Sequence, residues 1–429
     1  MLIEFSVENF KVFKNKATLS MVAHKPYKEH PESTYVHENF ADILFSKSAV
    51  IYGANGSGKS SLIEGLTFLN AYIAQGFITQ EQDANHQPFL FDQTSINAPT
   101  HFEIIFIGND NVKYHYGLSF NADRVIAEFL LSFVKKGVRA KTLFSRVYDE
   151  QTNNNQYYHP GLIENKRTIE IVVDKVNDSP KTSFLAALNQ YEAKQIKPVI
   201  HWLQLSLLTV PFNVNSEFTN FTKSNLIERI LDKNKGDNHK KEIIKLLNNF
   251  DLSINDIQII KRDLVLPDNL SPEVKSRLQA EMGHDIQVIH KTLSGKSYPI
   301  KYEHLSSGTK KLLDLSDFLY LCITTCEYEN TVLVFDEFEA SFHPHIVKKL
   351  YEMLVRVPSG KMQLIVTTHS PTLLDPELIR RDQVWFVEKN AELESELYSL
   401  VDFSPTVNDS IAKGWMQGRY GAVPYIEWE

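Results

Sequence analysis

The chain has 429 residues, of which 43% are hydrophobic and 11% aromatic, so it can bury a large core and wholesale disorder is excluded. At roughly 150 residues per domain, this length predicts about two to three domains. Lysine and arginine number 45 against 53 aspartates and glutamates, and the net charge of −8 excludes a globally basic, DNA-coating protein while leaving a local basic groove open.

The first half of the chain alternates between strand patterns and one helix pattern. Ile3, Phe5 and Val7 predict a half-buried strand, and residues 17–21 predict its partner. A short apolar strand at Ser48–Tyr52 leads into a glycine cluster, and residues 61–74 have helical spacing. An antiparallel meander is predicted over residues 102–106, 114–120, 125–134 and 142–147.

The second half changes from helices to an α/β pattern. Helical spacing is found in residues 182–208 and on both sides of the charged run 232–241, whereas residues 254–265 and 286–300 have strand patterns. Helices and buried strands alternate from residue 305, with helices predicted over 311–325 and 346–355 and strands over Thr331–Phe335, 363–367 and 384–387.

The strongest chemical signal is a complete G-x-x-x-x-G-K-S motif between an apolar strand and a helix. It consists of Gly53, Ala54, Asn55, Gly56, Ser57, Gly58, Lys59 and Ser60. Backbone N–H groups of such a loop suit phosphates, Lys59 adds a positive charge, and Ser60 offers a hydroxyl to Mg²⁺. The alternative is a chance glycine-rich turn, but the flanking strand and helix favour an ATP site, which we extend to Ser61.

A second signal is a pair of carboxylates at the end of Thr331–Phe335. A buried strand that ends in two acids needs a reason, because buried charge is costly unless it is paired or bound to metal. We predict that Asp336 binds Mg²⁺, directly or through water, and that Glu337 orients or deprotonates the attacking water. The alternative is an ordinary strand end with surface acids.

Two weaker motifs flank these acids in the chain. Leu305-Ser306-Ser307-Gly308-Thr309 precedes a helix and would by itself be a plain helix N-cap. His369 ends the next predicted strand, where a lone histidine is usually only a satisfied polar residue. Their positions relative to the other motifs favour a functional interpretation of both.

The order of these motifs resembles an ABC-type ATPase head of the SMC and OLD kind: Walker A, signature, Walker B, D-loop and switch histidine. The opening F-x-V-x-N-F-K-x-F of residues 5–13 is similar to the start of those heads. More narrowly, the chain resembles the RloA/AbiL-type (AAA15-like) ATPases of bacterial defence and restriction-associated loci. That resemblance rests on the signature and on residues 336–344, 381–386 and 418–424, and it covers roughly residues 1–150 and 300–429.

The resemblance implies an α/β fold, an ABC-type P-loop ATPase head with a mixed sheet core, an antiparallel β-subdomain and a mainly helical insertion. Residues 1–180 would form the N-terminal lobe with Walker A and the β-subdomain, and 181–285 the insertion. Residues 286–429 would form the C-terminal lobe with the signature, Walker B, D-loop and switch histidine.

The resemblance also assigns roles in a shared site. Ser306 and Gly308 would contact the γ-phosphate held by the opposite subunit, and His369 would sense that phosphate, so a homodimer or higher homo-oligomer forms through the ATP sites. The chain departs from the pattern at Ser307 and Thr309 of the signature and at His343, where transporters carry a D-loop aspartate. Gln87 is a candidate for the Q-loop glutamine.

Other features favour structural explanations. Cys322 and Cys326 cannot form a disulfide framework for this length; they predict core thiols in a reducing compartment. His343 and His345 could ligate a metal, although a D-loop accounts better for His343. A basic run could bind a phosphate backbone or a partner, or be a solvated face; it comprises Lys135, Lys136, Arg139, Lys141 and Arg146.

Two functions stay open. The first is a sensor or scaffold ATPase of an anti-phage (abortive infection) system with a separately encoded effector, such as a Toprim or RloB-like nuclease, and a DNA or phage-derived trigger. The second is a DNA-repair or DNA-maintenance ATPase that clamps nucleic acid. A transporter subunit is disfavoured, because no transporter-like Q-loop is found. No signal peptide or apolar run of membrane-spanning length is present, which predicts a cytoplasmic location and no membrane partner.

Overall fold

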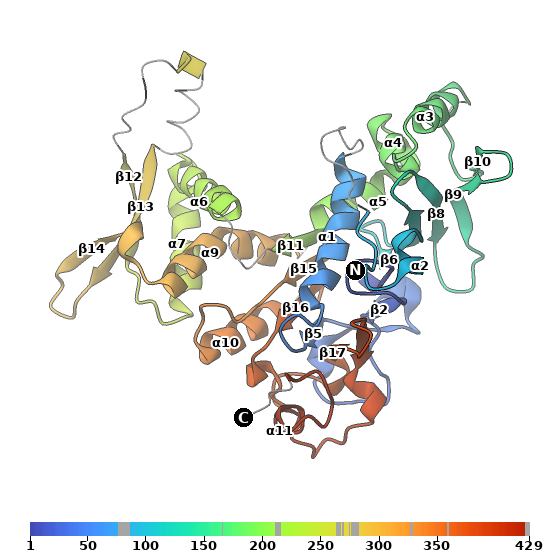
Figure 1. Ribbon diagram of the computed structural model, residues 1–429. Coiled ribbons are helices and arrows are strands. Elements are labelled where there is room, and N and C mark those ends of the chain that lie inside the picture. Colours follow the sequence, from blue (N-terminus) through green and yellow to red (C-terminus); the bar gives the residue numbers. More distant parts are fainter. Residues whose placement is uncertain are drawn as a thin grey trace. The chain divides into compact units, whose positions relative to one another are not determined.

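The computed structural model describes residues 1–75, 86–164, 166–210, 216–262, 267, 270–273, 275, 283–326, 329–357 and 360–424. The chain divides into two compact units (Figure 1). Unit 1 holds Met1–Val210, Cys326–Phe338 and Leu350–Glu429, and unit 2 holds Pro211–Thr325 and Glu339–Lys349. The three-part division at residues 180 and 285 stays a prediction.

A six-stranded sheet forms the centre of unit 1, in the order β11-β15-β16-β5-β17-β18. Its strands are β5 (Ser48–Tyr52), β11 (Leu207–Val210), β15 (Thr331–Phe335), β16 (Met362–Thr368), β17 (Val384–Lys389) and β18 (Ser395–Ser399). Every pairing is parallel except β17 with β18. The inner strands β5, β15 and β16 are buried along their whole length, as apolar runs in a parallel sheet should be.

A seven-stranded antiparallel sheet forms the second layer of unit 1, in the order β10-β9-β8-β7-β6-β1-β2. Its strands are β1 (Leu2–Glu8), β2 (Ala17–Ser20), β6 (Thr100–Ile107), β7 (Lys113–Phe120), β8 (Val125–Phe133), β9 (Lys141–Asp149) and β10 (Asn154–Tyr158). The predicted first strand and its partner pair as β1 with β2, and the predicted meander is confirmed. Gln363 joins the two sheets, because its buried amide bonds the backbone of Leu2 in both directions, at 2.7 and 3.0 Å.

Helix α1 (Lys59–Gln75) follows β5 after the glycine loop (Figure 1). Its apolar side chains belong to the core of unit 1. Phe68 of α1 stacks on Phe102 and Phe120 of the antiparallel sheet, with ring centroids 5.7 and 5.6 Å apart. This helix therefore connects the glycine loop rigidly to the second sheet. The other elements of this unit are α2 (Gln93–Ile96), α3 (Lys166–Asp178), α4 (Phe184–Gln190), α5 (Lys197–His201), α11 (Ile411–Met416), β3 (Thr34–Val36) and β4 (Leu44–Ser46).

Unit 2 combines helices with a three-stranded antiparallel sheet. Its elements are α6 (Ser216–Leu231), α7 (Gly236–Asn248), α9 (Ser307–Thr325), β12 (Asp256–Lys261), β13 (His284–Lys291) and β14 (Ser297–Lys301). Asp317 of α9 is buried and meets His239 at 2.7 Å and Arg229 at 3.3 Å, so one carboxylate holds the three helices together. Helix α10 (Pro344–Val355) begins in this unit and ends in unit 1.

The α/β class with a mixed core sheet and a separate antiparallel sheet is thus confirmed. One difference lies in residues 182–208, where the helical pattern ends early and Leu207–Val210 forms strand β11. This strand is only four residues long and pairs parallel to β15, a long-range contact that helical periodicity cannot reveal. Within the described part of the chain, no helix has the length and apolar character needed to span a membrane.

Candidate nucleotide site

The glycine loop of residues 53–58 connects β5 to α1, as the motif predicts. Gly56 and Gly58 have φ values of +73° and +112°, which other residues adopt only with strain. A Cβ at Gly58 would lie 2.8 Å from both Ser395 Oγ and Val12 Cγ2. A Cβ at Gly53 would collide with the Val387 carbonyl oxygen. The loop therefore keeps its shape only with glycine at these positions, and that shape is a concave backbone cradle at a helix N-terminus, suited to a phosphate group.

Lys59 begins α1, and its side chain folds back over the loop. Its Nζ donates to the carbonyl oxygens of Gly53 at 2.9 Å and Ala54 at 3.0 Å, and it lies 3.3 Å from His369 Nδ1. The residue is only 5% exposed, so its charge is available inside the loop rather than to bulk solvent. Ser60 and Ser61 follow in the first turn of α1, with Ser60 exposed.

The two predicted acids leave the end of β15 beside the end of β16. Asp336 Oδ1 accepts a hydrogen bond from the Thr367 hydroxyl, and the Glu337 N–H donates to the same hydroxyl at 2.8 Å. The next residue continues this pairing, because the Phe338 N–H donates to the Thr367 carbonyl oxygen at 3.0 Å. Both acids are partly exposed. Thr367 is a residue that the sequence reasoning missed, and only its place two residues before His369 hinted at a role.

His369 links the acids to the glycine loop. It follows β16 directly, two residues after Thr367, and its ring reaches Lys59. A pocket of about 680 Å³ opens beside it, lined by Gly53, Ala54, Asn55, Gly56, Ser57, His369, Val387, Glu388, Lys389, Trp415, Ala422, Val423 and Pro424. The glycine loop, the two acids after β15 and His369 thus lie within unit 1, at the carboxyl ends of neighbouring parallel strands, where α/β sheets bind ligands.

These residues fit Mg²⁺ and a nucleoside triphosphate. A side chain at Gly53 or Gly58 would collide with neighbouring atoms, so the loop's bare backbone faces the site. Among the described residues, the buried Ser57 Oγ has no hydrogen-bond partner. The Ser60 hydroxyl and the Asp336 carboxylate are hard oxygen ligands of the kind that Mg²⁺ prefers. Glu337, with a φ of +52°, stands in the left-handed region that non-glycine residues rarely adopt, and such strain is typical of functional sites.

The predicted signature lies in unit 2, where it forms the N-terminus of α9. Ser306 is the cap: its Oγ accepts from the Thr309 N–H at 3.1 Å and lies 2.8 Å from Thr309 Oγ1. Gly308 lies close to the segment that follows the two acids, since a Cβ there would lie 3.0 Å from the Ser341 carbonyl oxygen. A pocket of about 650 Å³ is shared by Asn249, Phe250, Asp251, Leu252, Ser306, Ser307, Gly308, Thr309, Leu312, Ser341, His343, His345, Ile346 and Lys349.

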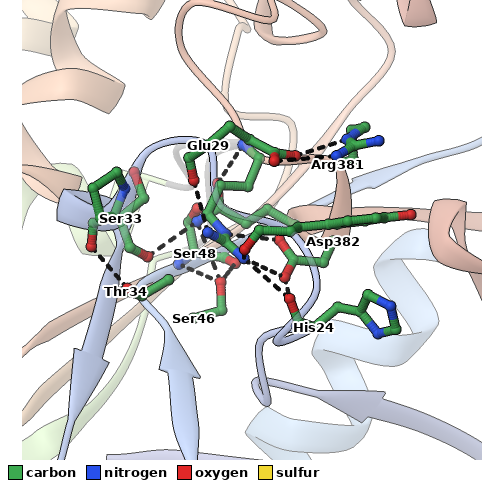
Figure 2. Close-up of polar contacts among 12 residues, drawn as sticks. His24, Glu29, Ser33, Thr34, Ser46, Ser48, Arg381 and Asp382 are labelled. Atoms are coloured by element: carbon green, nitrogen blue, oxygen red, sulfur yellow. Dashed lines mark hydrogen bonds and ion pairs between the residues drawn. The ribbon is translucent and has the colours of Figure 1, made fainter. Parts of the chain in front are cut away.

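The conspicuous R-D-Q motif near the C-terminus is structural. Arg381 binds Glu29 through two nitrogens, at 2.7 and 3.1 Å, and its guanidinium lies 3.8 Å from the Tyr27 ring centre (Figure 2). Beside it, buried Arg380 donates to both oxygens of Asp382, at 3.0 and 2.9 Å, and to backbone carbonyl groups of the 24–29 segment. This motif therefore fixes an N-terminal loop to the strand β17 that borders the glycine loop.

The remaining candidates take structural positions. Cys322 and Cys326 are both buried, as predicted for core thiols. Arg146 is 1% exposed, so it does not belong to the basic surface run, which consists of Lys135, Lys136, Arg139 and Lys141. His343 and His345 lie near each other, but no group of three metal-binding side chains occurs among the residues that the structure describes. Gln87 contributes its carbonyl oxygen to the Lys11 N–H at 2.7 Å.

Comparison with known proteins places these motifs in a family. A model of the family described as "AAA domain, putative AbiEii toxin, Type IV TA system" matches residues 48–375, which contain every predicted site residue. No curated protein matches the chain. Two similar solved structures are an SMC head bound to the C-winged helix domain of ScpA and the SMC head domain from Thermotoga maritima. The first has 14% identity, covers 93% of this chain and 97% of its own, and has a TM-score of 0.44. The second has 14% identity, 93% and 98% coverage, and a TM-score of 0.39.

Proposed function

The chain belongs to this AAA-domain family, and we propose that it is an ABC-class ATPase that binds and hydrolyses Mg²⁺-ATP at residues 53–61, Asp336, Glu337 and His369. The observation that carries this proposal is the meeting of three separate segments in unit 1. Lys59 of the glycine loop lies 3.3 Å from His369. Two residues before His369, the Thr367 hydroxyl donates to the Asp336 carboxylate and accepts from the Glu337 backbone N–H, directly after β15.

The residues divide the work by their chemistry. The loop N–H groups and Lys59 bind the β- and γ-phosphates, and Lys59 exchanges the carbonyl groups of Gly53 and Ala54 for phosphate oxygens when nucleotide enters. Ser60 and Asp336 would hold Mg²⁺, which would supply positive charge against the charge that develops on the phosphates. Glu337 orients the attacking water, and His369 contacts the γ-phosphate from the end of the neighbouring strand.

We further propose that two copies complete each other's sites. Ser306 and Gly308 present the N-terminus of α9, a nineteen-residue helix whose dipole favours an anion, and both line a pocket with the D-loop. In ABC-type heads this element meets the nucleotide of the opposite subunit. A homodimer, or a higher homo-oligomer built from such pairs, follows from that arrangement.

For the biological role we propose a sensor or scaffold in anti-phage defence, of the RloA/AbiL type, which acts on a separately encoded effector. The family description, which names a toxin of a toxin–antitoxin system, supports a place in such loci. We propose a Toprim or RloB-like nuclease as effector and DNA or a phage-derived molecule as trigger. Removing the neighbouring effector gene should abolish protection in a plaque assay; unchanged protection would refute the scaffold role.

The ATPase proposal is tested with purified protein and Lys59→Ala. This variant removes the charge inside the loop, so ATP affinity should fall by about a hundredfold or more, in line with the loss of a charge-assisted contact in a desolvated site. Lys16→Ala is the control, since Lys16 is a surface lysine paired with Glu103 at 3.1 Å. Titration with a fluorescent ATP analogue measures both. Unchanged affinity in Lys59→Ala would show that the loop is not the ATP site.

A further inference from the structure

One buried hydroxyl connects the two acids at the end of β15. Thr367 is 0% exposed and stands in β16, between β15 on one side and β5 on the other. Its hydroxyl has a single hydrogen, which goes to Asp336 Oδ1, so toward Glu337 it can only accept, and the Glu337 N–H supplies that bond at 2.8 Å. The directions of both hydrogen bonds are therefore fixed.

The backbone of the turn depends on these bonds. Regular pairing between the strands ends at Phe335 and Val366, and directly afterwards Glu337 takes a φ of +52°. Such a conformation is unfavourable for a residue with a Cβ and persists only when its surroundings enforce it. Two bonds to Thr367 enforce it here: the Glu337 N–H binds the hydroxyl, and the Phe338 N–H binds the carbonyl oxygen at 3.0 Å.

We propose that Thr367 is a positioning residue for ATP hydrolysis, which sets the Asp336 carboxylate and the Glu337 backbone through one hydroxyl. This inference rests on the proposed ATPase function. Because the hydroxyl donates to Oδ1 of Asp336, it would fix the orientation in which this carboxylate meets Mg²⁺. Because the same hydroxyl holds the Glu337 N–H, the direction in which the Glu337 side chain leaves the backbone is tied to the position of the metal ligand.

Thr367→Val and Thr367→Ser separate this role from simple packing. Valine keeps the β-branched shape and strand preference but removes the hydroxyl, whereas serine keeps the hydroxyl and loses one methyl group. A packing role predicts that serine, which leaves a small cavity, is at least as harmful as valine. A positioning role predicts that serine is close to the parent and valine is not.

The experiment compares the parent and both variants by steady-state ATP hydrolysis and by binding of a fluorescent ATP analogue, with Mg²⁺ and with EDTA. For Thr367→Val we expect kcat to fall about ten- to a hundredfold, the loss typical of one hydrogen bond to a charged group, and KM for Mg²⁺-ATP to rise as Mg²⁺ adds less to the affinity. Affinity in EDTA should stay near that of the parent, while the gain in affinity on adding Mg²⁺ should shrink about tenfold. Thr367→Ser should stay within about threefold of the parent on every measure.

Thr100→Val is the matched control for a lost buried hydroxyl. Thr100 is 0% exposed, begins β6 in the antiparallel sheet, and donates to the Asn9 carbonyl oxygen at 2.6 Å. The Thr100→Val variant should lower the melting temperature about as much as Thr367→Val does. It should leave the Mg²⁺ dependence of ATP binding unchanged.

Each outcome decides the question. Parental kcat and Mg²⁺ dependence in Thr367→Val, or equal impairment in Thr367→Ser, would overturn the positioning role while leaving the ATPase assignment intact. A parent protein whose nucleotide binding is absent or insensitive to Lys59→Ala would overturn the ATPase assignment, and the positioning role would fall with it. The inference is supported if Mg²⁺ adds less to the ATP affinity of Thr367→Val than to that of the parent, while Thr367→Ser behaves like the parent.

Discussion

Replacing Arg380 by methionine should destabilise unit 1 strongly. Its side chain and that of Asp382 are each only 2% exposed, and the guanidinium donates to both oxygens of Asp382. It also donates to the backbone carbonyl oxygens of Glu29 at 2.7 Å and Tyr27 at 3.2 Å. Methionine retains most of the apolar stem but leaves the buried Asp382 carboxylate without its cation. Among the described residues, that carboxylate would keep a hydrogen bond from the His24 N–H at 2.6 Å.

The expected loss is about 3–5 kcal/mol in the free energy of unfolding, the range seen when one member of a buried ion pair is removed. Arg381→Met is the comparison. The ion pair of Arg381 with Glu29 is more exposed, at 11% and 19%, so its loss should cost about 1–2 kcal/mol. Removing both buried charges in Arg380→Met/Asp382→Leu should recover part of the loss, since no unpaired charge is then left inside.

Urea unfolding followed by tryptophan fluorescence measures these differences. Trp202, Trp385 and Trp415 all lie in unit 1, so the signal reports the unit that carries the ion pair. A loss below about 1 kcal/mol in Arg380→Met, or one no larger than in Arg381→Met, would show that the buried pair does not hold the N-terminal loop in place.

Three further results are expected. Glu337→Gln should bind ATP but hydrolyse it slowly, because the substitution removes the carboxylate that orients the attacking water. A nucleotide-bound dimer should therefore accumulate on size exclusion. ATP turnover at the parental rate would refute this role of Glu337. Ser306→Arg should bind ATP almost normally yet stop hydrolysis, since a bulky cation blocks the N-terminus of α9. Mixing this variant with Lys59→Ala protein should restore partial activity. Normal hydrolysis by Ser306→Arg alone would leave residues 305–309 as a helix cap only. Burial raises the pKa of Asp314 from 3.8 to about 6, so this carboxyl binds a proton more tightly in the folded chain and stability falls as pH rises from about 4 to about 6. Asp314→Asn should remove that fall and stabilise unit 2 by about 1–2 kcal/mol at pH 7, measured as thermal melts at pH 4 and 7; an equal effect at both pH values would contradict the reasoning.

The local motifs of this protein could be read directly from the chain. A glycine loop between a strand and a helix depends on covalent neighbours, so residues 53–60 predict their own geometry, and the structure has β5, the loop and α1 in the expected order. The apolar run Thr331–Phe335 likewise predicts a buried strand with two acids at its end. Periodicity was sufficient for the antiparallel meander, because each strand there pairs with its neighbour in sequence.

Contacts between residues far apart in sequence required the tertiary structure. Thr367 binds Asp336 across 31 positions, and the His24 N–H binds Asp382 across 358, distances over which no local pattern connects the partners. The same reason explains Arg146, which resembles a surface cation in a basic run. It is buried, and its guanidinium donates to the carbonyl oxygen of Thr182, 36 positions away, at 3.1 Å. Sequence therefore specified which groups could do chemistry, whereas the packing of β15 against β16 decided which side chain would hold them in place.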